Sequence, residues 1–434
     1  MTGWWSSSTD PLPVPGGGTV RGLAVPPPSK SLTHRALAIA LVAREVVVVE
    51  RPLEAEDSAL FVEVLSRLGY GVERHPGRLV VAPPSAFPAR AELDCGNAGT
   101  LFRFLVALAA TLPVRSRIDG TPRLRERPVG PLVAALRALG VRIEELGAPG
   151  CAPLVVHGGR LAGGRVRLDA SESSQYLSAL LLAGQRADGP LEIEVAALAS
   201  APYVALTLDL LERMGGDARE VAAGRYRTRP SRLRGGTIAI ETDLSAAAYP
   251  AAAAALTGGT IRIVGVRRDS LQGDLGILDR LREMGARIAW AEDGVDVSGG
   301  ELVAIDTDLG ALPDQVPTLA ALAPFARGTT RIRNVAHLRI KESDRLAAMT
   351  AELRRVGATV DELADGLVIP GVWADRPAPT TREVVDPHDD HRIAMAMALV
   401  GLRRPGIAVA SPGCVAKSYP DFWSDLASWL GERA

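Results

Sequence analysis

The chain has 434 residues, of which 47 % are hydrophobic and 23 % are charged, enough for a large packed core and roughly two to four domains. The formal net charge of −1 excludes a general attraction to nucleic acids or acidic membranes, so any basic site must be local. No apolar run is long enough to span a membrane, and three cysteines without metal-like spacing favour a reducing cytoplasm.

The N-terminal region is expected to hold a flexible leader and one strand. Its first residues, MTGWWSSSTDPLPVPGGG, lack the basic and apolar segments of a secretory signal. The stretch GTVRGLAV at 18–25 is predicted to be a spare strand. Because the chain ends before its last repeated unit has a hairpin, we expect the N-terminal strand to complete that unit.

A repeated turn organises the rest of the chain. Helical runs end in a glycine and are followed by a strand, as in SRLGYGVE, RALGVRIE and REMGARIA. Glycine suits the position just past a helix C-terminus because the backbone turns left-handed there. A period of this kind is hard to produce by chance and indicates repeated structural units. The glycines, 70 to 75 residues apart, are Gly69, Gly140, Gly215, Gly285, Gly357 and Gly431.

A second helix is predicted roughly 40 residues before each glycine. These helices are apolar on nearly all sides, which indicates that each is buried. Their predicted starts are Ser31, Gly99, Ser174, Ser245, Pro317 and His391.

Short β-branched runs such as EVVVVE at 45–50 and TIAIET at 237–242 lie between the helices. Each unit is therefore predicted to run strand, buried helix, strand, amphipathic helix and hairpin, a βαβαββ order within an α/β fold. Six units divide naturally into two lobes of three, with crossings near residues 20 and 241. The predicted lobes are 21–240 and 1–20 together with 241–434.

Polar and basic residues gather at the predicted helix starts, in PPSKSLTHR, CGNAGTLFR, ASESSQY, RIKESDR, DDHR and AKSYPD. A helix N-terminus carries free N–H groups and a partial positive charge, so added hydroxyls and cations make an anion site. A single Ser or Thr at such a start is more often an ordinary cap. The whole set, however, favours a ligand pair with several negative charges. The only lysines among 49 basic residues, Lys30, Lys341 and Lys417, all lie in these motifs.

The sequence gives weaker evidence for a metal site, a nucleophilic cysteine or a P-loop nucleotide site. His388 and His391 could bind a metal, but the pair straddles a helix start and has no clear third ligand. Cys414 could be a nucleophile, although a buried small hydrophobe is the more usual role of a free cysteine. The chain contains no GxxxxGK[ST] run, which argues against a P-loop nucleotide site.

Nine motifs occur in order along the chain, and together they resemble the enolpyruvyl transferase family over roughly residues 18 to 430. They are PSKSLTHRAL, DCGNAGTLFRF, RERPVGPL, ESSQYLSAL, SAPY, LPDQ, RIKESDRL, DDHRIAMA and AKSYPDF. The resemblance implies two lobes, each of three repeated units with helices inside and sheets outside, in agreement with the repeat.

The resemblance is to the branch that transfers the enolpyruvyl group of phosphoenolpyruvate to the 5-hydroxyl of shikimate 3-phosphate and releases phosphate. It implies a cytoplasmic enzyme of aromatic amino acid biosynthesis, a glyphosate target, with no cofactor or metal. It also implies a monomer that binds neither nucleic acid nor membrane.

The resemblance also implies ligand contacts, residue by residue. Phosphoenolpyruvate should meet Lys30, Gly99, Arg127, Gln175, Arg345, Arg392 and Lys417. Shikimate 3-phosphate should meet Lys30, Ser31, Arg35, Ser173, Ser174, Gln175, Ser200, Tyr203, Asp314 and Lys341.

Three residues are expected to carry the chemistry. Asp314 is the candidate base for the 5-hydroxyl, and Glu342 is the candidate for moving a proton to and from the methylene carbon. Lys30 is assigned to the phosphate that must leave. Two carboxylates with separate tasks fit an addition followed by an elimination. His337 departs from the family pattern, in which an Asn often contacts shikimate 3-phosphate.

Three alternatives stay open at this point. A sister enzyme transfers enolpyruvate to a UDP-sugar, but it typically has a cysteine in the loop that corresponds to TPRLRERPVG, and this chain has none there. A catalytically inactive homologue would bind anions only. A ring of the sliding-clamp type is also built from repeats, but its hole would be lined by basic helix faces.

Overall fold

A computed structural model describes residues 9–375 and 382–431, so the first eight residues of the expected leader lie outside the described residues. The chain divides into two compact units: residues 28–241, and residues 1–27 together with 242–434. The sequence predicts that the chain passes between the lobes near residues 20 and 241. In the structure the boundaries between the two units lie after Pro27 and after Glu241.

Five of the six small sheets among the described residues share one connectivity, with a parallel pair of strands beside an antiparallel hairpin, and the sixth has three strands. In the unit of residues 28–241, the sheets have the following strand orders. The first is β14(Gly236–Ala239)-β3(Val47–Glu50)-β5(Arg78–Ala82)-β4(Gly71–His75). The second is β6(Arg90–Asp94)-β7(Arg115–Asp119)-β9(Leu154–His157)-β8(Arg142–Glu145). The third is β10(Gly164–Ala170)-β11(Leu191–Leu198)-β13(Arg225–Arg229)-β12(Asp217–Ala222).

The other unit repeats the pattern. Its first sheet is β2(Arg21–Ala24)-β15(Thr260–Val264)-β17(Gly294–Ser298)-β16(Arg287–Ala291). Its second is β18(Asp306–Asp308)-β19(Thr329–Arg333)-β21(Gly366–Pro370)-β20(Asp361–Leu363). The last sheet has three strands, β22(Glu383–Val385)-β23(Ile407–Val409)-β1(Leu12–Pro13). The α/β class and the repeated units predicted from the sequence are confirmed.

The pairing of the N-terminal strands differs from the prediction that the strand at 18–25 completes the last repeated unit. The strand predicted at 18–25 does not pair in the last sheet, because β2 runs parallel to β15 in the fourth. The two-residue β1 reaches the last sheet and pairs with β23. The strand that precedes the fourth unit's buried helix, β14, pairs with β3 of the first unit. The first and fourth units have therefore exchanged their first strands.

The repeated glycines follow the six amphipathic helices, each two residues past the helix end, and all six have a positive φ of 81° to 105°. This confirms the left-handed turn that the sequence predicts, which an L side chain adopts only with strain. The helices are α2(Glu56–Arg67), α4(Gly130–Ala138), α6(Pro202–Arg213), α8(Ile277–Glu283), α10(Arg345–Arg355) and α12(Phe422–Trp429).

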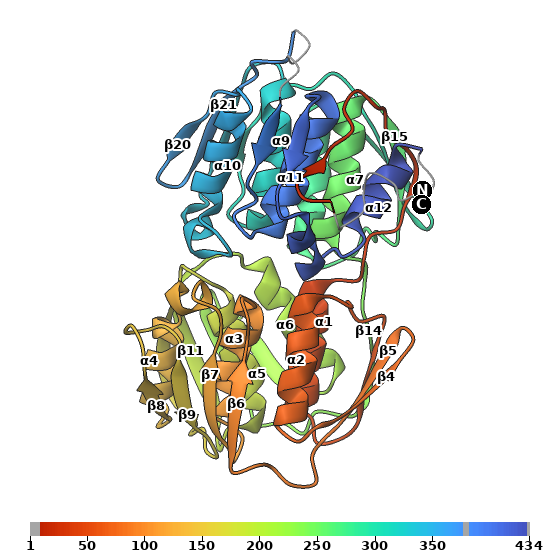
Figure 1. Cartoon of the computed structure of the whole chain (residues 1–434). Helices are drawn as coiled ribbons and strands as arrows, with labels where there is room; N and C mark the ends of the chain where they lie inside the picture. The colour runs from red at the N-terminus through yellow and green to blue at the C-terminus, as the bar shows by residue number, and fades with distance from the viewer. Residues whose placement is uncertain (1–8, 376–381, 432–434) are drawn as a thin grey trace. The chain divides into compact units, whose positions relative to one another are not determined.

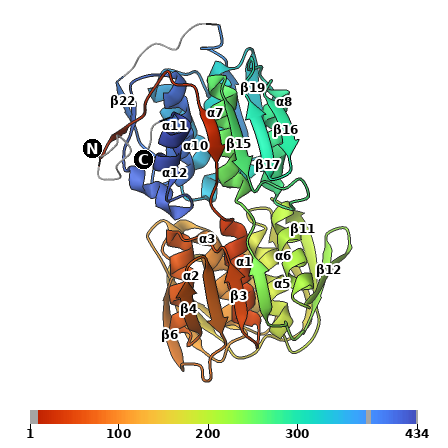
Figure 2. The same ribbon diagram turned by 90° about the vertical axis from the view of Figure 1, so that its right-hand side faces the viewer.

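The six apolar helices form the core of their units. In residues 28–241, α1(Lys30–Val42), α3(Gly99–Ala109) and α5(Gln175–Ala183) contact one another. In the other unit, α7(Leu244–Thr257), α9(Val316–Leu322) and α11(His391–Arg403) do the same, and Figure 1 shows these three side by side. Burial alternates along sheet strands such as β6 and β7, so one face of each packs on the core and the other faces solvent. Figure 2 shows β15 and β17 beside α7.

Short 3-10 turns connect these elements, and several carry the polar motifs. They are Leu124–Glu126, Gly184–Arg186, Gly273–Gly276, Pro313–Gln315, Ala323–Phe325, Ala336–Ile340 and Pro412–Lys417. Among the described residues, no helix has the length and apolar character needed to cross a membrane.

Candidate active site

The start of α1 carries the first predicted ligand group. The Ser29 hydroxyl accepts a hydrogen bond from the backbone N–H of Leu32 and caps the helix, which places Lys30 and Ser31 in its first turn. Lys30 Nζ lies 3.2 Å from Oδ2 of Asp57, with the two side chains 15 % and 5 % exposed. Asp57 comes from the first turn of α2, and sequence reasoning missed it. An acidic residue at a helix start is common, which is why it gave no separate signal.

Arg35 lies one turn further along α1 and is fully buried. Its Nε donates to Oγ1 of Thr207 at 2.9 Å, and its Nη2 donates to the carbonyl of Tyr203 at 2.8 Å. Burial lowers the pKa of Arg35 to about 10, and the nearby Tyr203 offsets part of that effect. The structure therefore joins Arg35 and Tyr203, two predicted shikimate 3-phosphate residues, by a direct contact.

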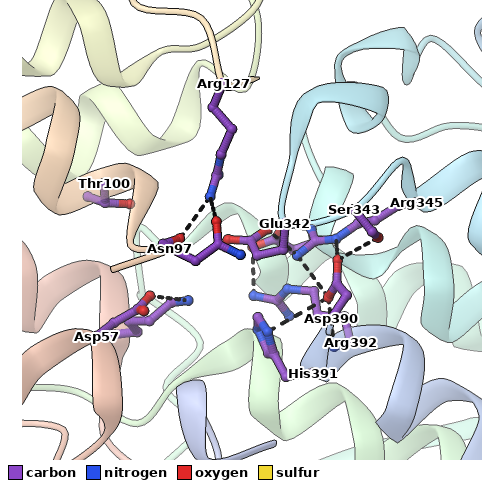
Figure 3. A network of polar contacts seen from close by, with 12 residues as sticks. Asp57, Asn97, Thr100, Arg127, Glu342, Ser343, Arg345, Asp390, His391 and Arg392 are labelled. Carbon is purple, nitrogen blue, oxygen red and sulfur yellow. Dashed lines mark hydrogen bonds and ion pairs between the residues drawn. The ribbon is translucent and has the colours of Figure 1, made fainter. Parts of the chain in front are cut away.

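The segments before α3 and α4 bring Asn97 and Arg127 together (Figure 3). Arg127 Nη1 donates to the Asn97 carbonyl at 2.9 Å and to its Oδ1 at 3.3 Å. A Cβ at position 99 would lie 2.5 Å from Arg127 Nη2, closer than real contacts allow. Glycine at position 99 leaves room for this guanidinium, which would have to shift if the position carried a Cβ.

Gln175 at the start of α5 connects to the same region. Its Nε2 donates to Oγ1 of Thr100 at 2.8 Å, and its Oε1 accepts from Nη1 of Arg103 at 2.8 Å. Ser173 Oγ accepts from the Gln175 backbone N–H at 3.3 Å. The side-chain amide thus donates one hydrogen bond and accepts another, and these two contacts fix its orientation.

Two further predicted residues precede helices in this unit. Ser174 is the N-cap of α5 and is buried. Ser200 adopts φ +55° just before α6, and its carbonyl accepts from the Tyr203 N–H. A left-handed serine is uncommon, and such strained residues cluster at functional sites.

In the other unit, Arg345 is the centre of a buried cluster (Figure 3). It begins α10, and each of its three nitrogens donates to a different carboxylate at 2.8 Å. The acceptors are Asp390, Asp314 and Glu342. Burial alone would lower the pKa of Arg345, but these three negative charges outweigh it and raise the pKa. Arg345 is therefore a permanent cation between the two candidate acid–base carboxylates.

Asp314 has a second arginine partner. Arg392 Nη2 donates to its Oδ2 at 2.6 Å, from the start of α11, where Asp390 caps the helix. Burial would raise the pKa of Asp314, but Arg392 and Arg345 overcome that effect and hold the pKa well below its usual range. In this arrangement Asp314 is ionised. To act as a base it must exchange at least one arginine contact for a substrate hydroxyl.

A further carboxylate, Asp274, lies next to this cluster and was not predicted. It accepts hydrogen bonds from Ser245 Oγ at 2.7 Å and from Gln315 Nε2 at 3.0 Å. Burial and the negative charge of Asp314 raise the pKa of Asp274. Its run, LQGD, carries no basic residue, so nothing marked it in the sequence.

The remaining lysines lie in the same unit. Lys341 precedes Glu342, and its charge acts on both Asp314 and His337. Burial and Lys341 together lower the pKa of His337 to about 4, so this side chain is a neutral imidazole at pH 7. Lys417 ends the Pro412–Lys417 turn and is buried.

Two further hypotheses from the sequence, a metal site at His388 and His391 and a nucleophilic Cys414, find little support. His388 pairs with Glu352, and no group of three or more His, Cys, Asp or Glu residues in the described ranges is arranged to hold a metal ion. Burial and Asp390 raise the pKa of Cys414 to about 12, which leaves it a neutral thiol rather than a nucleophile.

The predicted residues thus fall into two groups, one in each unit. Lys30, Arg35, Arg127 and Gln175 gather at helix starts in residues 28–241, with Asn97 and Asp57 as added partners. The group around Arg345 lies in the other unit, with Asp390 as an added partner. Their roles toward ligands stay predictions.

Known proteins resemble most of the chain. Residues 14–426 match the family model of EPSP synthase (3-phosphoshikimate 1-carboxyvinyltransferase). A 3-phosphoshikimate 1-carboxyvinyltransferase of Syntrophobacter fumaroxidans is 48 % identical over 403 residues, covering 92 % of this chain and 94 % of that protein. One of Methanoculleus marisnigri is 42 % identical over 406 residues, with the same coverage of 92 % and 94 %.

A solved structure of EPSP synthase from Acinetobacter baumannii is also similar, with a TM-score of 0.78 and 26 % identity. The match covers 97 % of this chain and 98 % of that one. Together with the ordered motifs and the buried clusters of arginine and carboxylate, these matches show that the chain belongs to the EPSP synthase family, the 3-phosphoshikimate 1-carboxyvinyltransferases.

Proposed function

We propose that this chain transfers the enolpyruvyl group of phosphoenolpyruvate to the 5-hydroxyl of shikimate 3-phosphate and releases inorganic phosphate. The observation that carries the proposal is the cluster in which Arg345 contacts both Asp314 and Glu342. It puts a permanent cation, a candidate base and a candidate proton carrier within one hydrogen-bonded group. That combination suits an anionic substrate on which a proton must be added and then removed.

The proposed addition uses the two carboxylates separately. Glu342, an ionised acceptor of Arg345 in this structure, first takes up a proton and then gives it to the methylene carbon of phosphoenolpyruvate. The 5-hydroxyl oxygen bonds to C2, and its proton goes to Asp314. The product is a tetrahedral adduct that still carries the phosphate. Arg345 and Arg392 bind the substrate's negative charge, and each can do so because guanidinium binds carboxylate or phosphate through two parallel hydrogen bonds.

The proposed elimination reverses the carbon chemistry. Glu342 removes a proton from the methyl group, the C2–phosphate oxygen bond breaks, phosphate leaves, and the enolpyruvyl double bond is restored. Asp314 gives up the hydroxyl proton to solvent and is ionised again. Lys30 and Lys417 stabilise the leaving phosphate. Lysine suits this task because its ammonium is a compact charge that can exchange a proton.

The shikimate 3-phosphate contacts are proposed mainly for residues 28–241. Support comes from the buried serines before α5 and the strained Ser200 before α6. Helix N-termini with hydroxyl groups bind phosphate well. We propose that His337 also faces this ligand, as a neutral imidazole beside Lys341.

We further propose a monomer in a reducing cytoplasm, with neither nucleic acid nor membrane as a partner. All three cysteines are free, which agrees with such a compartment.

The direct test is phosphate release from phosphoenolpyruvate, measured with shikimate 3-phosphate, with a UDP-sugar, and with no acceptor. We expect release only with shikimate 3-phosphate, and we expect Asp314→Asn to abolish most of it. Release with the UDP-sugar would instead identify the sister activity. Absence of release with either acceptor, from protein that binds both substrates, would identify an inactive homologue.

A further inference from the structure

The buried face of α10 carries two charged residues one heptad apart, Arg345 and Glu352. Residues seven apart lie on the same face of a helix, and α10 contacts α11. Arg345 contacts Asp390 at the start of α11. Glu352 lies two turns further along, is 0 % exposed, and takes no part in the reaction proposed above.

Glu352 contacts the chain just before Asp390. Its Oε2 accepts a hydrogen bond from the backbone N–H of Asp386 at 3.1 Å, and its Oε1 lies 3.3 Å from Nε2 of His388. On its other side, Arg355 Nε donates to Oε2 at 2.8 Å. A buried carboxylate is stable only with donors of this kind, so its position and that of the 386–388 segment determine each other.

The segment that Glu352 holds is strained. His388 and Asp389 are consecutive and both left-handed, with φ of +54° and +52°. His and Asp adopt this conformation more easily than most residues, but two in succession still cost energy and persist only where the surroundings fix them. The next residue is Asp390, which caps α11 and receives Arg345, and Arg392 follows two positions later.

We propose that Glu352 is a positioning residue: by fixing the 386–388 segment it sets the entry of the chain into α11 and thereby the placement of Arg392. Arg345 and Glu352 together then hold both ends of the 386–390 segment from one face of α10. The proposed consequence for activity rests on the proposed function, because Arg392 is assigned there to phosphoenolpyruvate. The consequence for the segment itself does not.

The test compares Glu352→Gln with two matched variants. Glu352→Gln keeps the size of the side chain but removes its charge. Arg355→Gln removes only the half-exposed partner and leaves the contacts to the segment intact. Leu353→Val lowers stability from the neighbouring buried position without touching the segment. Two quantities are measured: amide hydrogen exchange of residues 386–390 without substrate, and the KM and kcat for phosphoenolpyruvate.

For Glu352→Gln we expect exchange at 386–390 and the KM for phosphoenolpyruvate each to rise by at least about tenfold, because small misplacements of a binding group have effects of this size. The kcat should fall by a smaller factor. Arg355→Gln and Leu353→Val should keep the KM of the wild type. Unchanged exchange and KM in Glu352→Gln would overturn the proposal. So would an equal rise in KM in Leu353→Val, since that would reflect lost stability alone.

A second variant decides the case in which Glu352→Gln does not fold. His388→Asn keeps a residue that tolerates a positive φ but cannot reach the Glu352 carboxylate, and position 388 is partly exposed. We expect the same changes on a smaller scale, about threefold, since one contact of several is lost. Unchanged exchange and KM in this variant would also overturn the proposal. If the wild type itself released no phosphate, the proposed function would fail, while the exchange experiment would still decide the role of Glu352.

Discussion

Arg345 and Asp390 form a fully buried ion pair: Nε lies 2.8 Å from Oδ2, and the side chains are 2 % and 0 % exposed. A buried charge that loses its partner is costly, and Arg345 has three carboxylate partners. The pair joins the first residue of α10 to the cap of α11, so it supports the fold as well as the proposed site.

We therefore expect Arg345→Met to lower the free energy of unfolding by about 3 kcal/mol or more and to abolish activity. Urea denaturation and phosphate release measure the two effects. The matched control is Arg282→Met, which removes an exposed i,i+3 pair with Asp279 in the same unit. Its effect should be within about 1 kcal/mol. Equal losses in the two variants would contradict a special role for the buried pair.

The low pKa of Asp314 predicts how stability depends on pH. Its folded pKa lies below the usual 3.8 of an unfolded chain. The ionised form therefore stabilises the fold fully above the unfolded pKa, and this contribution is lost as the pH falls toward the folded pKa. The difference in unfolding free energy between the wild type and Asp314→Asn should be constant above about pH 5 and shrink below about pH 4.

Asp425 provides a control of opposite sign. Burial raises its pKa, and its Oδ2 accepts from the Tyr419 hydroxyl. A raised folded pKa contributes stability below the unfolded pKa that is lost as the pH rises. The difference between the wild type and Asp425→Asn should therefore grow as the pH falls. Urea titrations at several pH values from 3 to 7 measure how the difference for Asp314→Asn and the difference for Asp425→Asn each change with pH. If both differences changed in the same direction, the assigned effects of the local charges would be wrong.

Gly99→Ala should weaken phosphoenolpyruvate binding and lower sensitivity to glyphosate. The new methyl group would lie 2.5 Å from Arg127 Nη2, so the guanidinium must move away from Asn97. We expect the KM for phosphoenolpyruvate to rise by about tenfold or more, as for other small displacements of a binding group. Gly71→Ala is the control, because its Cβ would meet nothing nearer than 3.6 Å. Steady-state kinetics with and without glyphosate decide, and identical inhibition of wild type and Gly99→Ala would refute the idea.

Lys30→Arg and Lys417→Arg should each reduce kcat/KM by about 100-fold, equivalent to about 2.7 kcal/mol of transition-state stabilisation. Arg keeps the charge but is broader and does not exchange a proton as Lys does. Lys30 forms an ion pair with Asp57, and Lys417 is buried. The surroundings of these two side chains therefore leave little room for the broader guanidinium of Arg. Thermal melts check the fold, and Arg282→Lys at the surface should leave the kinetics unchanged. Near-full activity in both Arg variants would mean that the placement of the three lysines is a coincidence.

Much of the architecture follows from local sequence. Gly69 and its five counterparts mark helix ends because only glycine turns left-handed there without strain, and the structure has all six with positive φ. The apolar helices are buried because they have no polar face to give to water. The motifs proposed to bind the substrates likewise stand at helix starts, where Ser29 and Asp390 act as caps.

Tertiary structure alone decided which partners these elements take. The runs GTVRGLAV and TIAIET around β2 and β14 predict strands, but nothing in them selects β15 as the partner of β2 and β3 as the partner of β14. Asp57, Asp274 and Glu352 are acidic residues in ordinary helical or turn contexts, so their roles become visible only where burial removes water and they must find cations or donors. Local propensity acts over a turn or two of chain, whereas strand pairing and the desolvation of charge depend on which distant segments pack together.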